Sequence, residues 1–201
     1  MPITTREAFD ITSKYVGDSP VVAALGRTSE VAFALFPNQT LFLDSMTEVA
    51  SIALGVAISI GPTVPIFAFD TDGGQLMGLY LLPTLAAHKN QVPNLTVLVL
   101  DNELYEAAGG AASRYSKLDW RQLGIAFGLR VQVAHDEAEL DAALSDSGRA
   151  DELSYIVVKI LNADPLAPTQ KTLDGIESKY RFVRHLEKLT GHQILLPAEK
   201  S

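Results

Sequence analysis

Two consecutive segments decide the fold: Phe69-Asp-Thr-Asp-Gly-Gly-Gln-Leu-Met77 and Asn94-Leu-Thr-Val-Leu-Val-Leu-Asp-Asn-Glu-Leu-Tyr105. Each carries the end of a β-rich run followed by polar turn residues, and an apolar helical stretch connects them. In a right-handed βαβ unit, consecutive parallel strands lie side by side, so both runs end on one edge of the sheet. We therefore expect Asp72 and Asn102 to lie close together at that edge.

The same alternation of β-rich runs and helical patterns extends along most of the chain. The β-rich runs cover 20–25, 40–43, 65–70, 95–100, 130–133 and 154–160. The helical patterns cover 4–16, 29–36, 47–59, 74–88, 119–127 and 136–145. This order predicts an α/β fold: a doubly wound, mostly parallel six-stranded sheet with helices on both faces.

Length and composition favour a single domain over residues 1–201. With 201 residues and 47% hydrophobic composition, the chain can bury a core of its own. The segment 162–170 contains two prolines and reads as a loop, and a final helix is expected around 173–189. The predicted domain therefore ends in a C-terminal loop and helix that begin at about residue 162.

The acidic balance and the absence of cysteine exclude several classes of function. A net charge of -8 and a pI near 4.9 argue against nucleic-acid binding, which needs a basic face. Without cysteine, the chain forms no disulfide, thiolate nucleophile or cysteine zinc site. The first residues lack the apolar core of a signal peptide, and the longest apolar run, 52–60, is too short to span a bilayer. We expect a cytoplasmic protein that binds neither nucleic acid nor membrane.

Hard oxygen ligands and backbone amides converge on the edge where the two segments end. Asp72 and Asn102 offer oxygen atoms of the kind that Mg²⁺ prefers. Gly73, Gly74 and the helix N-terminus beside them supply N–H groups and a positive dipole for a phosphate. A metal–diphosphate complex fits this edge. The alternative is that Asp72 and Asn102 are ordinary cap and turn residues, a common use of both residue types.

These residues resemble the Gly-Asp-Gly…Asn-Asn signature of thiamine-diphosphate enzymes, whose acid and second Asn hold Mg²⁺ against the cofactor's diphosphate. In this chain the signature reads Thr71-Asp72-Gly73…Asp101-Asn102. A wider likeness extends to the cofactor-binding half of sulfopyruvate and phosphonopyruvate decarboxylases. The segments that carry this likeness are 26–33, 44–55 and 100–110.

The chain departs from the family pattern at four positions. Thr71 places a β-branched residue where the family has a glycine in a tight turn beside the diphosphate. Asp101 replaces the first Asn of the signature but leaves Asn102 in place. In the family's Gly-Ser-Met-Gly segment, Asp44 and Thr47 replace the two glycines. Whether these substitutions weaken or abolish cofactor binding is left open by the sequence.

The resemblance implies thiamine diphosphate and Mg²⁺ as cofactors. Asp72, Asn102 and the backbone carbonyl of Leu104 would bind the metal, with two diphosphate oxygens and a water completing an octahedral shell. Met46 would be this chain's catalytic residue, because it props the thiazolium against the aminopyrimidine and so bends the cofactor. The expected cofactor-binding residues are Gly26, Arg27, Thr28, Asp44, Ser45, Met46, Asp72, Gly73, Gly74, Asn102, Leu104 and Tyr105.

Several of these residues also have a purely structural interpretation. Thr28 or Ser29 would serve equally well as the N-cap of the helix after the first strand, and Met46 as core packing. Ser45 and Glu48 fit a capping box with Ser45 as the N-cap. In that interpretation Glu48 is a structural residue and not the glutamate that activates the cofactor.

By resemblance, the reaction is the decarboxylation of a small 2-oxo acid with a second acidic group, such as sulfopyruvate or phosphonopyruvate. A complete enzyme of this kind needs a second domain, which binds the aminopyrimidine and carries the activating glutamate. The resemblance therefore implies a partner subunit with the pyrimidine-binding domain, in a heteromer with at least two chains of each kind. Two alternatives stay open: a carboligase subunit of a biosynthetic pathway, and a structural subunit that has lost the cofactor.

Overall fold

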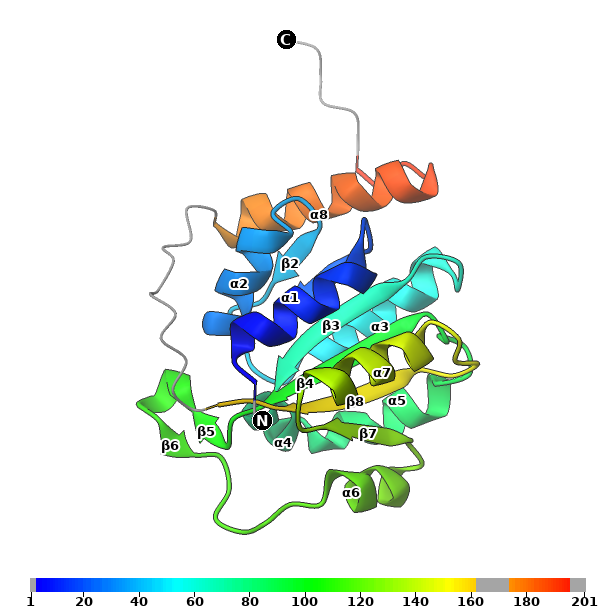
Figure 1. The fold of residues 1–201 in the computed structure, drawn as a ribbon. Coiled ribbons are helices and arrows are strands. Elements are labelled where there is room, and N and C mark those ends of the chain that lie inside the picture. Colours follow the sequence, from blue (N-terminus) through cyan, green and yellow to red (C-terminus); the bar gives the residue numbers. More distant parts are fainter. Residues whose placement is uncertain (1–2, 162–173, 196–201) are drawn as a thin grey trace.

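The computed structural model describes residues 3–161 and 174–195. Its centre is a six-stranded sheet in the order β2-β1-β3-β4-β8-β7, in which every pair of neighbouring strands is parallel (Figure 1). An antiparallel hairpin, β5–β6, follows β4. The strands are β1 Val21–Ala23, β2 Thr40–Phe42, β3 Ile66–Thr71, β4 Leu95–Asp101, β5 Leu104–Tyr105, β6 Ala111–Ala112, β7 Val131–Ala134 and β8 Ser154–Lys159.

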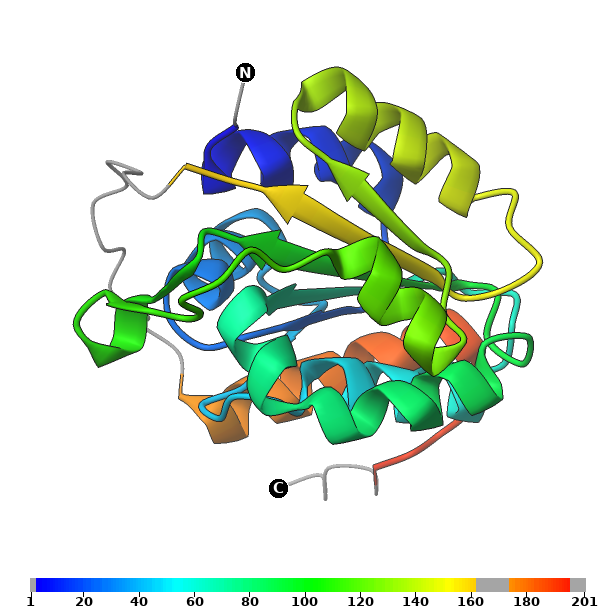
Figure 2. The same ribbon diagram turned by 90° about the horizontal axis from the view of Figure 1, so that it is seen from below.

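Helices cover both faces of the sheet, as Figures 1 and 2 show. The α-helices are α1 Thr5–Val16, α2 Arg27–Leu35, α3 Val49–Ile60, α4 Asp72–Met77, α5 Leu82–His88, α6 Trp120–Phe127, α7 Glu137–Ser147 and α8 Gly175–Thr190, with 3-10 turns η1 Leu79–Leu81 and η2 Glu106–Ala108. Buried residues of α1, α2 and α7 pack on one face, and those of α3, α5, α6 and α8 pack on the other.

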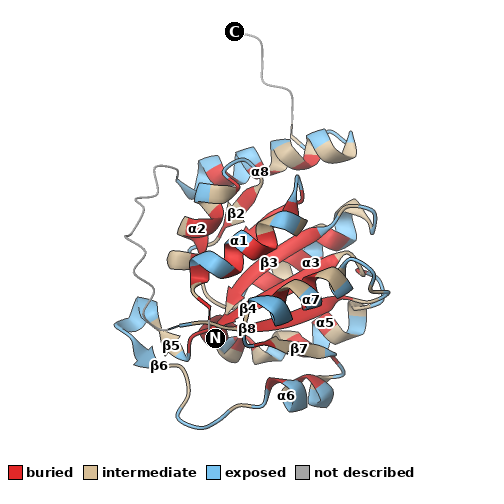
Figure 3. Ribbon diagram, viewed as in Figure 1, coloured by how far each residue is buried: buried red, intermediate tan, exposed pale blue. Residues whose placement is uncertain are grey.

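The central strand β3 shows how the two hydrophobic cores arise. Ile66 and Ala68 belong to the core under α3 and α5, whereas Phe67 and Phe69 belong to the core under α1 and α2. Because successive side chains of a strand point to opposite faces, a strand buried on both faces must be apolar throughout. Figure 3 shows β3, β4 and β8 buried along most of their length.

The predicted fold class is confirmed, and all six predicted strands of the main sheet are present within two residues of their expected ends. The chain runs from β1 to β2 on one side and then returns to place β3 on the other side of β1. The loops that follow β1 and β3 therefore leave the sheet in opposite directions. In open α/β sheets this switch point forms a crevice at the carboxyl ends of the strands.

The prediction of one continuous helix over 74–88 is wrong. The structure divides this segment into α4, the turn η1 and α5, with Gly78 closing α4 and Pro83 in the first turn of α5. A proline inside a helix lacks the amide donor and clashes with the carbonyl four residues earlier. A continuous helix is therefore disfavoured here, and the proline is accommodated by a new helix start.

The capping box predicted for α3 is also wrong. The helix begins at Val49 with Glu48 as its N-cap residue, and no described side chain caps it. Ser45 instead donates its hydroxyl to the Glu48 carboxylate, and Thr47 between them has a φ of 80°. This left-handed residue turns the backbone away from the geometry in which Ser45 would reach the helix amides.

The prediction for the C-terminal helix holds, whereas the hairpin after β4 was missed. The predicted final helix is confirmed as α8, which begins after Asp174, whose side chain accepts a hydrogen bond from Glu177 N. The loop predicted over 162–170 lies outside the described residues. The β5–β6 hairpin was not predicted, since each of its strands has only two residues. Within the described ranges, no helix combines the length and apolar character needed to cross a membrane.

Candidate functional site

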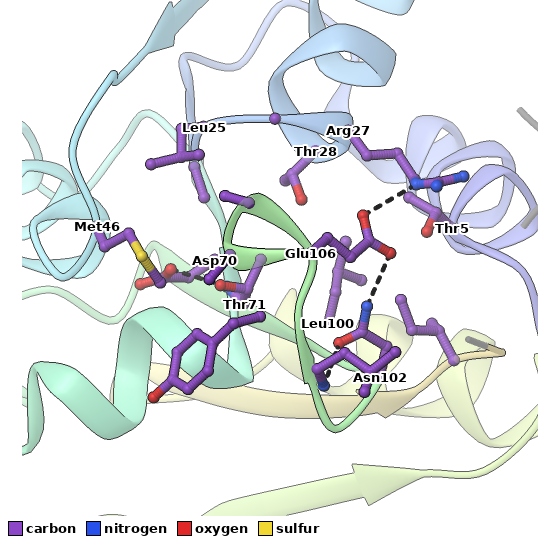
Figure 4. A pocket seen from close by; sticks show the side chains of 17 residues that line it. Thr5, Leu25, Arg27, Thr28, Met46, Asp70, Thr71, Leu100, Asn102 and Glu106 are labelled. Atoms are coloured by element: carbon purple, nitrogen blue, oxygen red, sulfur yellow. Dashed lines mark hydrogen bonds and ion pairs between the residues drawn. The ribbon is translucent and has the colours of Figure 1, made fainter. Parts of the chain in front are cut away.

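A cavity of about 400 Å³ opens at the carboxyl ends of β1, β3 and β4, beside the switch point (Figure 4). Its lining comes from the loop after β1, the end of β3 and the segment that follows β4. The lining residues are Thr5, Ala24, Leu25, Gly26, Arg27, Thr28, Met46, Asp70, Thr71, Leu100, Asn102, Leu104, Tyr105, Glu106, Ala107, Ala108 and Ile160.

The structure brings most of the predicted site residues to this cavity. Those that line it are Gly26, Arg27, Thr28, Met46, Asn102, Leu104 and Tyr105. Gly26 is the N-cap residue of α2 and has a φ of 77°, a conformation that favours glycine. Within the part of the chain that the structure describes, no side chain caps α2, so neither Thr28 nor Ser29 takes that role. The first amides of α2 therefore remain suited to an anion.

Gly73 lies directly behind the cavity wall. A Cβ atom on Gly73 would lie 2.5 Å from Cε1 of Tyr105 and 3.5 Å from Cε of Met46. The ring of Tyr105 thus needs a glycine beneath it, and Met46 reaches the same place from the loop before α3. The three residues come from separate segments, and the crossing of these segments assembles one wall of the site.

Five predicted residues do not line the cavity: Asp72, Gly73 and Gly74, which are buried at the start of α4, and Asp44 and Ser45 in the loop before α3. The hydroxyl of Ser45 donates to Glu48, and Oδ2 of Asp44 lies 3.9 Å from the position of a Cβ atom on Gly175, at the start of α8. Met46 is therefore the residue of this segment that points into the cavity. Thr71, which replaces a glycine of the family, has an extended backbone (φ −119°, ψ 157°) that does not require glycine, and its hydroxyl accepts a hydrogen bond from Gly74 N.

Asp72 is the first residue of α4, and its side chain is fully buried. Its Oδ2 atom accepts hydrogen bonds from the hydroxyl of Ser113 and from Nη1 of Arg114, the latter at 3.0 Å. Its Oδ1 atom is buried and has no hydrogen-bond partner among the described residues. Burial raises the pKa of Asp72, and the nearby Asp101 carboxylate raises it further, against the opposing effect of Ser113. A buried carboxylate oxygen without a partner is costly unless a ligand occupies it.

Asn102 faces the cavity from the turn after β4. Its Oδ1 atom accepts a hydrogen bond from Leu104 N at 2.9 Å, and its Nδ2 atom donates to Oε1 of Glu106 at 2.9 Å. The other oxygen of Glu106 pairs with Nε of Arg27 at 3.2 Å. Glu106 therefore bridges two predicted cofactor-binding residues across the cavity, as the dashed lines in Figure 4 show. Sequence reasoning missed this role, because no local pattern relates Glu106 to Arg27.

Asp101, next to Asn102 in the chain, is held by two cationic side chains and an indole. The Nη2 atom of Arg114 lies 2.9 Å from Asp101 Oδ1, and Lys159 and the indole of Trp120 contact Asp101 Oδ2. These donors lower the pKa of Asp101 against the opposing effect of burial. Arg114 also contacts Glu103 at 2.8 Å. Sequence reasoning missed this cluster, and it explains why an acid is stable where the family has an asparagine.

Asp70, the penultimate residue of β3, belongs to a second buried network. Its oxygens accept from Thr71 N and from the amide of Gln75, and the Gln75 carbonyl accepts from the hydroxyl of Tyr155 at 2.6 Å. Burial raises the pKa of Asp70 to about 6. The carboxylate lines the cavity from below and keeps its hydrogen bonds within the protein.

The residues at this edge fit a divalent cation. The unpartnered oxygen of Asp72, at the end of β3, is of the hard, anionic kind that such a cation prefers, and Asn102 and Leu104 would offer an amide oxygen and a backbone carbonyl after the adjacent strand β4. Within 3–161 and 174–195, no group of three or more His, Cys, Asp or Glu residues could hold a metal ion. The proposed ligand set does not require such a group, because two of its three oxygens are uncharged.

Comparison with curated proteins finds homologues, although no protein-family profile matches the chain. It is 29% identical over 194 residues to sulfopyruvate decarboxylase subunit beta of Methanothermobacter thermautotrophicus, covering 94% of this chain and 99% of that protein. It is 28% identical over 169 residues to phosphonopyruvate decarboxylase of Streptomyces viridochromogenes and 34% identical over 143 residues to that of Streptomyces hygroscopicus. The matched regions cover only 42% and 35% of these two proteins.

Solved structures with the same fold are thiamine-diphosphate-dependent enzymes. One from Mycobacterium smegmatis superposes with a TM-score of 0.69 and 22% identity, over 81% of this chain and 32% of that one. The 4-hydroxybenzoylformate decarboxylase of Rhodococcus jostii superposes with a TM-score of 0.66 and 16% identity, over 80% of this chain and 33% of that one. These likenesses confirm the fold, and the homologues confirm the resemblance stated from the motifs.

Proposed function

We propose that this chain is the diphosphate-binding subunit of a two-subunit, thiamine-diphosphate-dependent 2-oxo acid decarboxylase. The observation that carries the proposal is the buried, unpartnered Oδ1 atom of Asp72 at the carboxyl edge of the sheet. It lies in a chain that matches a decarboxylase subunit over 99% of that subunit's length. In this proposal Asp72, Asn102 and the backbone carbonyl of Leu104 hold Mg²⁺, and the metal holds the diphosphate.

In this proposal the chain's own residues bind the cofactor and orient it. The first amides of α2, together with Arg27 and Thr28, are placed to donate hydrogen bonds to negatively charged oxygens at the cavity. Gly73 carries no Cβ atom, and this leaves room for the ring of Tyr105 at the cavity wall. When bound, the cofactor supplies the nucleophilic carbon and the electron sink for decarboxylation.

Met46 would set the shape of the bound cofactor. Its side chain enters the cavity between Gly73 and the loop after β1. In that position a bulky apolar group would lie against the bound cofactor and, as in the enzymes that the chain resembles, would favour its bent shape. Glu48 accepts a hydrogen bond from Ser45. It is not the activating glutamate, which we assign to the partner subunit.

The homologues support a substrate class and an assembly. Relatives named for sulfopyruvate and phosphonopyruvate support a small 2-oxo acid with a second acidic group as substrate. This chain spans less than half of each phosphonopyruvate decarboxylase, and its full-length relative is named a subunit. We infer a heteromer in the cytoplasm with at least two copies of this chain and two of a partner that carries the pyrimidine-binding domain.

One observation favours a second candidate, a structural subunit that has lost the cofactor. Glu106 already engages Arg27 and Asn102, and the ring of Tyr105 covers Gly73. Under this alternative the cavity would stay closed to thiamine diphosphate. The unpartnered oxygen of Asp72 argues against it, because a site without a ligand would retain a costly buried group.

Calorimetric titration decides between the two candidates. Thiamine diphosphate and Mg²⁺ are titrated into the full chain, co-expressed with the subunit that carries the pyrimidine-binding domain. We expect saturable binding that Asp72→Ala and Asn102→Ala each abolish, because each change removes a metal ligand. Asp10→Ala, which removes an exposed carboxylate from α1, is the matched control and should bind normally. Absence of binding by the unaltered protein would favour the structural subunit.

A further inference from the structure

Two residues that sequence reasoning missed, Ser113 and Arg114, both donate to one atom of Asp72. They follow the β5–β6 hairpin, which returns the chain toward the end of β3. The backbone of Ser113 is anchored there, since its N–H donates to the carbonyl of Glu103 at 2.9 Å. Its hydroxyl and Nη1 of Arg114 both reach Oδ2 of Asp72.

This asymmetry fixes how the Asp72 carboxylate is turned. A free carboxylate has acceptor sites on both oxygens and can rotate about its bond to Cβ. Here both donors engage Oδ2, while Oδ1 is buried and unpartnered within the described residues. Rotation would cost both hydrogen bonds, so the uncommitted oxygen is held in one direction.

Arg114 is itself held rigidly. The side chain is only 10% exposed, and its Nη2 atom contacts both oxygens of Asp101, at 2.9 and 3.0 Å, as well as Glu103. Asp101 is in turn held by the indole of Trp120, through a hydrogen bond that does not involve Lys159. The planar guanidinium contacts three carboxylates at once, those of Asp72, Asp101 and Glu103, which a lysine ammonium cannot do with the same geometry.

We propose that Ser113 and Arg114 are positioning residues of the metal site, which hold Oδ2 of Asp72 so that Oδ1 is presented to a divalent cation. This inference rests on the proposed function. Groups that orient a metal ligand from behind commonly change metal affinity by about 10- to 100-fold when they are removed. Here the orienting groups are a hydroxyl and a guanidinium on a hairpin, far in sequence from the ligand that they hold.

Whether removing Arg114 weakens or tightens metal binding distinguishes a positioning role from an effect of its charge alone. Arg114 is a cation beside the proposed site of another cation, so removing it reduces electrostatic repulsion and by charge alone should tighten metal binding. If Arg114 orients Asp72, removing it should weaken binding despite that gain. Lys159 provides the matched control, because it carries the same charge in the same cluster and contacts Asp101 and Glu103.

The test measures Mn²⁺ affinity by electron paramagnetic resonance, in the presence of thiamine diphosphate and on the full chain with its pyrimidine-binding subunit. We expect Arg114→Met to weaken Mn²⁺ binding by at least about 10-fold. Ser113→Ala should weaken it by a smaller factor, because Arg114 remains. Lys159→Met should bind as tightly as the unaltered protein or more tightly. Fluorescence of Trp120, the only tryptophan, checks that the cluster around Asp101 is intact in each variant.

The outcomes distinguish this inference from the proposed function. Unchanged or tighter Mn²⁺ binding by Arg114→Met would overturn the positioning role. Equal losses in Arg114→Met and Lys159→Met would also overturn it, since both variants remove the same charge. If Arg114→Met does not fold, Ser113→Ala decides, and normal affinity in that variant refutes the inference. Failure of the unaltered protein to bind Mn²⁺ would overturn the proposed function, and this inference with it.

Discussion

Thr47 and Thr71 both stand where the resembling family has glycine, but the two positions have different backbones. Thr47 has a φ of 80°, whereas Thr71 is extended, with a φ of −119°. A β-branched residue in the left-handed region is strained, and glycine adopts that region freely. An extended backbone, such as that of Thr71, does not require glycine. The two departures that look alike in sequence therefore have opposite consequences for stability.

Replacing each threonine by glycine tests this difference. Thr47→Gly should raise the free energy of unfolding by about 1 kcal/mol, because it relieves the left-handed strain. Thr71→Gly should lower the free energy of unfolding by roughly a few tenths of a kcal/mol. The reason is that the hydrogen bond from Gly74 N to the Thr71 hydroxyl, which caps α4, is lost. Urea unfolding of both variants provides the measurement. A gain in stability for Thr71→Gly, or a loss for Thr47→Gly, would contradict the assigned conformations.

Asp70 predicts a dependence of stability on pH. Burial raises its pKa from 3.8 to about 6 in the folded protein. Between these values the folded state binds more protons than the unfolded state, so stability falls as the pH rises from about 4 to about 6. The stabilisation from the neutral carboxyl group is complete below the unfolded pKa and is lost as the pH passes the folded pKa.

Asp70→Asn should remove this dependence, because the amide cannot ionise. Relative to Asp70→Asn, the unaltered protein should lose on the order of 3 kcal/mol between pH 4 and pH 7, for a pKa difference of about two units. Chemical denaturation of both proteins at the two pH values measures this difference. Contributions of other titrating groups largely cancel in the comparison. Parallel pH profiles would show that Asp70 does not titrate as its burial implies.

At the scale of elements, two helix glycines have opposite roles. Gly124 in α6 packs against β7, and a Cβ atom there would clash with Val131 Cγ2 and lie 2.8 Å from the carbonyl oxygen of Leu129. Gly55 in α3 is exposed and has no neighbouring atom within 4 Å of that position. The first glycine permits a close helix–strand contact. The second only adds backbone freedom to the unfolded chain.

Alanine substitution should separate these roles. Gly124→Ala should lower the free energy of unfolding by about 1–3 kcal/mol, because the strand cannot move away without disturbing the core. Gly55→Ala should raise it by about 0.5–1 kcal/mol, because alanine favours the helix. Thermal and urea unfolding of the two variants give the comparison. Equal stabilisation by both changes would show that Gly124 of α6 does not pack as closely against Val131 of β7 as the structure shows.

At the scale of the whole molecule, the proposed active site is divided between two chains. In this proposal the cavity at the carboxyl edge of the six-stranded sheet provides the diphosphate half of the site. We expect the isolated chain to be inactive toward 2-oxo acids, with activity appearing on mixing with the subunit that carries the pyrimidine-binding domain. Light scattering of the co-expressed complex should give the mass of at least two chains of each kind. Turnover by a monomer or homodimer of this chain alone would refute the divided site.

The local pattern of the chain was sufficient to predict the sheet and much of the site. Asp72 and Asn102 follow β3 and β4, which are paired along their length, and this adjacency was predicted from strand order alone. Periodicity is a local property, and parallel neighbours in a βαβ unit follow from its handedness. Gly26, Met46 and Tyr105, which the motifs at the ends of elements named as site residues, line the cavity.

The order of the main strands, the sheet and the edge at which the cavity lies were therefore predictable, because these depend on local patterns and on the handedness of the crossovers. The partners of the side chains at that edge were not predictable, because they come from distant segments of the chain. Arg114 reaches Asp72 across 42 positions in the chain, and Glu106 reaches Arg27 across 79. Such contacts leave no periodic or spacing signal, because they arise when the hairpin after β4 folds back over the ends of the strands.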